Sequence, residues 1–229
     1  MLPALAAALL VAAAAAGVPL ARATRDMVEV TNGEETYRYE RGLAPDDAGA
    51  IAAYLRHLGE SRPEIVRVPG RTGTFLAADF CGATGESLGR CLLLLQAQPA
   101  GVRELSRTRG AGEAYGLRPV VFAGGGRIVV LAELATEYSR GVRVYEIAGA
   151  PIRELGTIDA GVPGELGETD PTPFASVRLE RGELAVRFDR DLVIGTGKQG
   201  APVARKPVVF RQRDGEFVLD APEKARRGR

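Results

Sequence analysis

The chain has 229 residues, of which 45% are hydrophobic and 26% are charged. With 30 Lys and Arg against 29 Asp and Glu, its formal net charge is +1 at pH 7. This balance is too apolar and too nearly neutral for an intrinsically disordered protein, and it provides no net positive field to attract nucleic acid. One His and two Cys are too few for a zinc site with four Cys or His ligands.

The beginning of the chain is typical of a secretory signal peptide. Leu5–Gly17 is an uncharged run of mostly Ala, Leu and Val, and Ala21-Arg22-Ala23 has the small residues that precede a signal-peptidase cut. We expect residues 1–23 to be removed, so that the mature chain starts at Thr24 and is periplasmic or secreted. The run is shorter than the roughly 20 residues of a membrane-spanning helix. An uncleaved anchor is the alternative; after cleavage we expect no stable membrane span.

A β-hairpin is the first element predicted in the mature chain. Val28–Thr31 and Glu34–Glu40 flank Asn32-Gly33, a dipeptide that favours a two-residue turn. This hairpin carries Tyr37 and Tyr39, whose side chains suit a contact surface because they are both apolar and able to hydrogen-bond. Ordinary packing within the sheet is the alternative for both tyrosines.

One helix is predicted next. It starts at Pro45, which fits the first turn of a helix, and Asp46 and Asp47 lie at the positive end of the helix dipole. Gly59 and Pro63 end it. Its apolar face, formed by Ile51, Leu55 and Leu58, is expected to cover one face or one end of a sheet.

Two cysteines follow in a region of predicted strands. Because export places Cys81 and Cys91 in an oxidising compartment, we expect them to form a disulfide, which closes a loop of about ten residues. Two separate buried thiols are the alternative. The spacing is not that of a C-x-x-C redox motif.

Everything after Pro63 is predicted to be strand and loop, with a weak internal repeat. Leu92–Leu95 is followed by Gly101–Leu105, and Val142–Tyr145 is followed in the same way by Pro151–Leu155. A three-stranded unit that recurs at about 50 residues is typical of β-propeller blades or of a long β-meander.

Two hairpins and two loops are predicted toward the C-terminus. Arg181-Gly182 and Asp214-Gly215 each lie between segments of alternating apolar and polar residues, as in a two-residue hairpin. Gly161–Pro173 and Gly195–Lys206 are rich in Gly or Pro and are expected to be exposed loops. Residues 221–229 form a basic tail that we expect to be disordered.

Together these elements predict a mainly β fold. We expect a single domain over residues 24–220, built as an antiparallel β-meander with one N-terminal α-helix. Its strands would pack as a sandwich or as a partial propeller.

Three motifs resemble chemical signatures, and each lacks a required partner. Ser87 lies in a G-x-S-x-G sequence, but strands are expected beyond it and the one His, His57, precedes it. Gly195–Lys198 lacks the earlier Gly and the following hydroxyl of a phosphate-binding loop. Asp189-Arg190-Asp191 is followed by Val193 where a calcium loop needs another oxygen ligand. We therefore predict no catalytic residue, no metal site and no cofactor.

By elimination, the sequence predicts a non-enzymatic binding or interaction module of the cell envelope. Its ligand would be a protein, a glycan or other cell-wall component, or a small molecule, and not nucleic acid. The candidate binding surface comprises Tyr37, Tyr39, Glu165, Glu168 and Asp170. One version of this hypothesis is inhibition of a secreted hydrolase by a protruding loop.

The alternative is a carboxylate-dependent hydrolase that acts on glycans, since glycoside hydrolysis requires two nearby carboxyl groups. Five acidic residues are expected near strand ends, where a sheet presents side chains to a cleft: Asp79, Glu133, Glu137, Asp159 and Asp189. The sequence does not show which of them converge.

Overall fold

The computed structural model describes residues 17–24, 26–32, 35–56, 63–81, 89–112, 114, 116–137, 139–165 and 167–220. The predictions made on residues 1–16, on His57, on Ser87 and on the tail at 221–229 lie outside these residues. Within them the predicted fold class is confirmed. The protein is mainly β, its strands pair antiparallel with one exception, and the described part of the chain has one α-helix.

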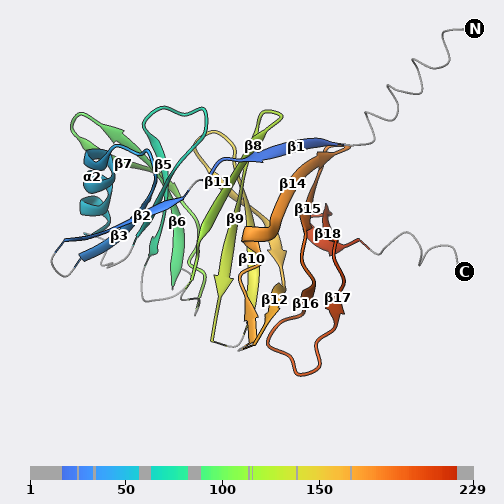
Figure 1. The fold of residues 1–229 in the computed structure, drawn as a ribbon. Coiled ribbons are helices and arrows are strands. Elements are labelled where there is room, and N and C mark those ends of the chain that lie inside the picture. The colour runs from blue at the N-terminus through green and yellow to red at the C-terminus, as the bar shows by residue number, and fades with distance from the viewer. Residues whose placement is uncertain are drawn as a thin grey trace, which may run out of the picture.

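Two large sheets and one small sheet make up the molecule (Figure 1). The six-stranded sheet has, in order, β2 (Met27–Asn32), β3 (Glu35–Glu40), β4 (Glu64–Arg67), β5 (Thr74–Phe80), β6 (Arg90–Gln98) and β7 (Gly101–Arg107). The nine-stranded sheet has the order β11 (Ile152–Ile158), β10 (Arg140–Ile147), β9 (Arg127–Ala135), β8 (Pro119–Gly124), β1 (Val18–Arg22), β14 (Ala175–Glu180), β15 (Glu183–Phe188), β18 (Val208–Arg213) and β19 (Glu216–Leu219). The small sheet consists of β13 (Gly167–Thr169), β12 (Ala160–Gly164), β16 (Leu192–Ile194) and β17 (Val203–Ala204).

The nine-stranded sheet curls into a partial barrel. Its outer strands approach each other: the Gln212 side chain on β18 donates a hydrogen bond to the Leu155 carbonyl on β11 at 3.4 Å, and Gly156 lies against the Phe217 ring on β19. Apolar side chains that point inward fill the barrel and include Leu20, Leu131, Val144, Phe188 and Phe210.

The helix α2 (Pro45–Arg56) connects β3 to β4, which form the one parallel pair among the described strands. Parallel neighbours need a crossover of a dozen or more residues, and the helix provides it. It follows three strands rather than opening the fold. Ile51 and Leu55 are fully buried between the helix and the six-stranded sheet, so this part of the apolar face covers a sheet face as predicted. Leu58 and Gly59 lie outside the described residues.

Strand β6 lies between two cores. Successive side chains of a strand point to opposite faces. Leu92 and Leu94 therefore pack toward the nine-stranded sheet, whereas Leu93 and Leu95 pack toward the helix, and all four are fully buried. The result is three layers, helix, sheet and partial barrel, with a further core inside the barrel.

The predicted repeat corresponds to two meanders, β5-β6-β7 and β9-β10-β11, which lie in different sheets. Each has a register shift at the equivalent place, between Leu94 and Leu95 in the first and between Val144 and Tyr145 in the second. Such a bulge strengthens the local twist of a strand pair. The two meanders pack face to face in a sandwich, one layer of which is curled into the partial barrel.

The predicted hairpins are confirmed as β14–β15, β18–β19 and β2–β3. Arg181 and Gly182 have φ of 54° and 87°, and Asp214 and Gly215 have φ of 51° and 85°. Positive φ at both central residues is typical of the type I′ turn, whose twist matches that of the flanking strands. The Gly33 turn lies outside the described residues.

The prediction of two exposed loops is wrong in part. Gly161–Pro173 contains the paired strands β12 and β13 and the beginning of a 3-10 helix, Thr172–Phe174, with Thr172 buried. Gly195–Lys206 contains β17 and the buried Thr196. Gly and Pro signal turns, but strand pairing decided the conformation of these segments: β12 pairs with β13 beside it and with the distant β16, and β17 pairs with β16.

The segment Val18–Arg22, predicted to belong to the signal peptide, forms β1. Its first residues pair with β14 and its last residues pair with β8. Leu20 is 5% exposed and belongs to the barrel core. Strand β1 thus joins the two halves of the nine-stranded sheet (Figure 1).

Candidate functional site

A cavity of about 690 Å³ lies where the chain that leaves β1 passes the six-stranded sheet. Its walls are the end of β1, the connection from β3 to α2 and the turn between β4 and β5. The volume is typical of small-molecule sites, which span about 300–1,000 Å³. The charged side chains that line the cavity are Arg22, Glu40, Asp47, Arg67 and Arg71.

Glu40 is the buried carboxylate of the cavity. It is 2% exposed, and it accepts hydrogen bonds from the Arg67 backbone N–H at 2.9 Å and from the Arg67 guanidinium at 3.3 Å. A buried charge is tolerated when it is paired and hydrogen-bonded. The charges of Glu40 and Arg67 therefore compensate each other.

Arg22 and Arg71 are held differently, by carbonyl oxygens. The Arg22 guanidinium donates to the Pro173 carbonyl at 3.2 Å, and the Arg71 guanidinium donates to the carbonyls of Gly149 and Ile147. A carbonyl positions a guanidinium without neutralising it. Among the residues that the structure describes, neither arginine forms an ion pair.

The tight turn between β4 and β5 positions Arg71. The Arg71 N–H donates to the Val68 carbonyl at 3.2 Å, and the Thr74 N–H donates to the Arg71 carbonyl at 3.2 Å. A guanidinium has five N–H donors, so the carbonyl contacts leave donors for a ligand. With Asp47 as the remaining acidic group, the two arginines make this cavity suited to an anion.

A second polar cluster surrounds Glu133 on β9. Its side chain is 7% exposed and forms ion pairs with Arg140 at 3.4 Å and with Arg118 at 3.8 Å. Burial raises the pKa of Glu133, and the charge of Asp170 raises it further, against the lowering effect of the two arginines. A carboxyl group with a raised pKa near a second carboxylate is a pattern of acid–base sites.

The residues around Glu133 are hydrogen-bonded to other groups of the protein. Asp170 accepts one bond from the Thr172 N–H at 2.8 Å and one from the Thr172 hydroxyl at 2.9 Å. The Thr196 hydroxyl accepts a bond from the Arg140 N–H at 2.9 Å. Each oxygen of Asp170 thus has a protein partner.

Of the other four carboxylates predicted near strand ends, two are engaged by protein partners. Asp189 forms an ion pair with Arg187 at 3.0 Å, Asp159 accepts hydrogen bonds from Thr196, and Glu137 is exposed. The side chain of Asp79 lies outside the described part.

The residues of the predicted binding surface fall into two groups in different sheets. Tyr37 and Tyr39 lie side by side on β3 with ring centroids 6.1 Å apart, and both pack half-buried against the core beneath α2. Glu165 is exposed at the β12–β13 hairpin, whereas Glu168 and Asp170 are half-buried. The role of each group in binding stays a prediction.

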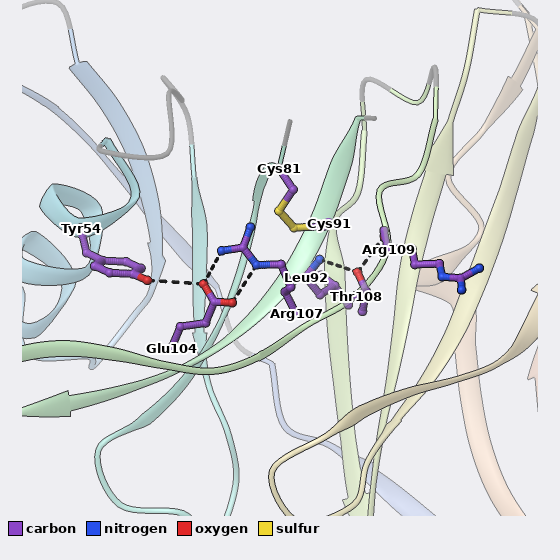
Figure 2. Close-up of a disulfide and its surroundings, with 8 residues drawn as sticks. All are labelled: Tyr54, Cys81, Cys91, Leu92, Glu104, Arg107, Thr108 and Arg109. Atoms are coloured by element: carbon purple, nitrogen blue, oxygen red, sulfur yellow. Dashed lines mark hydrogen bonds and ion pairs between the residues drawn. A yellow bond between two sulfur atoms is a disulfide. The ribbon is translucent and has the colours of Figure 1, made fainter. Parts of the chain in front are cut away.

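The predicted disulfide between Cys81 and Cys91 is confirmed. Their Cα atoms are 5.7 Å apart, within the usual range for a disulfide. Figure 2 shows that it lies beside a polar network in which Tyr54 of α2 donates to Glu104 at 3.4 Å and Arg107 forms two bonds with the same carboxylate. Burial raises the pKa of Tyr54, and the charge of Glu104 adds to the shift. This network links the helix to β7.

The cavity is not predictable from local sequence patterns. Arg22 falls within the predicted signal peptide, and Arg71 falls in a region predicted only as strand and loop. The available signal was Gly70-Arg71-Thr72-Gly73, which places an arginine between two glycines in a turn.

Comparisons with protein-family models, with curated proteins and with solved structures give no match. No helix in the described residues is long and apolar enough to cross a membrane. In that same part of the chain, no group of three or more His, Cys, Asp or Glu side chains is placed to hold a metal ion.

Proposed function

We propose that this protein is an exported binding module of the cell envelope, with a small ligand that carries a carboxylate or phosphate group. The observation that carries the proposal is the pair Arg22 and Arg71 in the cavity. Both guanidinium groups are positioned by carbonyls, and neither is paired with a carboxylate in the part of the chain that the structure describes. Guanidinium donors match the geometry of carboxylate and phosphate oxygens.

The disulfide supports the export part of the proposal. The bond between Cys81 and Cys91 is of a kind that persists in the periplasm or outside the cell and is rare in the cytosol. The apolar run at Leu5–Gly17 supports it independently, because it has the length of the apolar part of a signal peptide.

Isothermal titration calorimetry with three compounds tests the ligand class. Trigalacturonic acid presents carboxylates, glycerol 3-phosphate presents a phosphate, and maltotriose is the neutral control. We expect saturable binding of one of the two anions and none of maltotriose. Equal binding of the neutral sugar, or no binding of either anion, contradicts the proposal.

Substitutions in the cavity test the site itself. Arg22→Gln and Arg71→Gln should each weaken binding of the anion about tenfold or more, because a hydrogen bond to a charged group contributes about 1.5–3 kcal/mol. Arg187→Gln is the matched control, since it removes an arginine on β15 that does not line the cavity. If it weakens binding as much, the ligand responds to overall charge and not to this site.

The second candidate function is hydrolysis of a glycan by Glu133 and Asp170. The raised pKa of Glu133 favours it, because such a group could protonate a glycosidic oxygen while the other carboxylate acts as base or nucleophile. Chromogenic glycosides test this candidate, and activity lost in both Glu133→Gln and Asp170→Asn but kept in Arg71→Gln would favour it over binding. We prefer binding because Asp170 is engaged by Thr172 through both oxygens.

A further inference from the structure

Strand β1 is integrated into the nine-stranded sheet over its whole length. Val18, Pro19 and Leu20 are in register with β14, and Ala21 and Arg22 are in register with β8. The pairing continues past the strand, since the Ala23 N–H donates to the Val121 carbonyl at 2.7 Å and the Thr24 hydroxyl accepts from the Val121 N–H. These contacts link the N-terminal segment to residues far along the chain.

Two glycines lie where β1 and neighbouring strands approach each other closely. A Cβ atom at Gly124 on β8 would come within 3.1 Å of the Pro19 carbonyl and 3.2 Å of the Leu20 Cα. Gly17 has φ of +69°, and a Cβ there would lie 2.5 Å from the Glu180 side chain. The backbone at Gly17 therefore favours glycine, and a side chain at Gly124 would crowd β1.

Removal of residues 1–23 would take β1 out of this sheet. It would remove the Leu20 side chain from the barrel core. It would also leave backbone N–H and C=O groups of β8 and β14 unpaired, which destabilises the sheet and favours aggregation. It would also remove Arg22 from the cavity. A cut after Ala23 is therefore incompatible with this fold and with the proposed ligand site.

We propose that signal peptidase cuts after Ala16, ahead of β1, so that the mature chain starts at Gly17 and keeps Arg22 in the cavity. Residues 14–16 are Ala-Ala-Ala, which satisfy the small-residue pattern as well as Ala21-Arg22-Ala23 does. Hydrolysis of the bond between Ala16 and Gly17 consumes one water, giving a carboxylate on the leader and an amino group on Gly17. This inference rests on the proposed export.

The intact mass of the exported protein is the first test. The full chain with a C-terminal affinity tag is produced in a Gram-negative bacterium and recovered from the periplasm. We expect the mass of a chain that starts at Gly17. A chain that starts at Thr24 overturns the cut site but leaves export supported, whereas an unprocessed chain in the cytoplasm contradicts both.

Two substitutions distinguish the cut sites. A large residue directly before the cut blocks the small-residue recognition, so Ala16→Phe should abolish processing to Gly17. The matched variant Ala23→Phe should change the mass only by the substitution. If Ala23→Phe blocks processing and Ala16→Phe does not, the proposal is wrong.

The contribution of β1 to folding is tested on two oxidised proteins that start at Gly17 and at Thr24. The shorter protein should fail to fold or should unfold about 10 °C lower or more. In the longer protein, Leu20→Ala should lower the midpoint of thermal unfolding by several degrees. Arg22→Gln should lower the affinity for the anion and leave this midpoint unchanged. Equal midpoints for the two lengths, or for Leu20→Ala and the unsubstituted protein, would overturn the structural role of β1.

Discussion

Glu133 and Glu146 are two buried carboxyl groups whose pKa values move in opposite directions. Burial and the charge of Asp170 raise the pKa of Glu133. Burial also acts to raise the pKa of Glu146, but hydrogen bonds from Arg127 and Arg153 bring it below its usual value. The two residues therefore link stability to pH with opposite sign.

Glu133→Gln tests the raised pKa. Because folding favours the protonated carboxyl, its contribution to stability is present below the unfolded pKa of about 4.3 and is lost as the pH rises through the higher folded pKa. We expect the free energy of unfolding of the unsubstituted protein, relative to Glu133→Gln, to fall as the pH rises from about 4 toward neutral. Urea denaturation across this range measures it, and a difference that does not vary with pH contradicts the shift.

Glu146→Gln should show the opposite dependence. Because the folded pKa is lowered, the stabilisation is present above the unfolded pKa and is lost as the pH falls through the folded value. We expect a loss of about 2 kcal/mol at neutral pH and a smaller loss in acid. Glu154→Gln is the control, because its pair with Arg143 spans 3.9 Å and is partly exposed; it should cost less than about 1 kcal/mol. Equal losses would show that the two arginine bonds of Glu146 add nothing.

Among the elements, the disulfide ties the end of β5 to the beginning of β6. The bond joins residues separated by 10 positions, and chain entropy predicts that closing such a loop contributes about 2–3 kcal/mol. Reduction should therefore lower the midpoint of thermal unfolding by several degrees. The double variant Cys81→Ala/Cys91→Ala, measured with and without reductant, should show no such response. A response in the variant would point to an effect of the reductant elsewhere.

For the whole molecule, we expect the layers to unfold together, because the side chains of one strand pack into two different cores. Leu94 on β6 lies in the core between the two large sheets, while its neighbour Leu93 lies in the core beneath the helix. We expect Leu94→Ala to lower the free energy of unfolding by about 2–5 kcal/mol and to do so in one cooperative transition. Far-ultraviolet and tyrosine circular dichroism should give the same midpoint. Leu184→Ala, inside the barrel, should behave likewise; separated transitions would show that the layers unfold independently.

Local sequence determined the features that short-range chemistry controls. Pro45 and the acidic first turn specify where α2 begins. Arg181-Gly182 and Asp214-Gly215 specify type I′ turns because those residues accept positive φ. The disulfide followed from having two cysteines and a segment typical of export. Each of these predictions depends on residues close together in the chain or on composition.

Tertiary structure decided what the sequence left open, because period-two alternation assigns a side chain to a face but does not name the strand that will pair with it. Val18–Arg22 has the composition of a signal peptide, yet it pairs with β8 and β14 as a strand of the sheet. Arg22 and Arg71 meet at one cavity only through that placement. The effect of the Asp170 charge on the pKa of Glu133 likewise depends on the position of the small sheet. Both polar sites bring together residues that are distant in the chain, so they form only when the strands have packed into the fold.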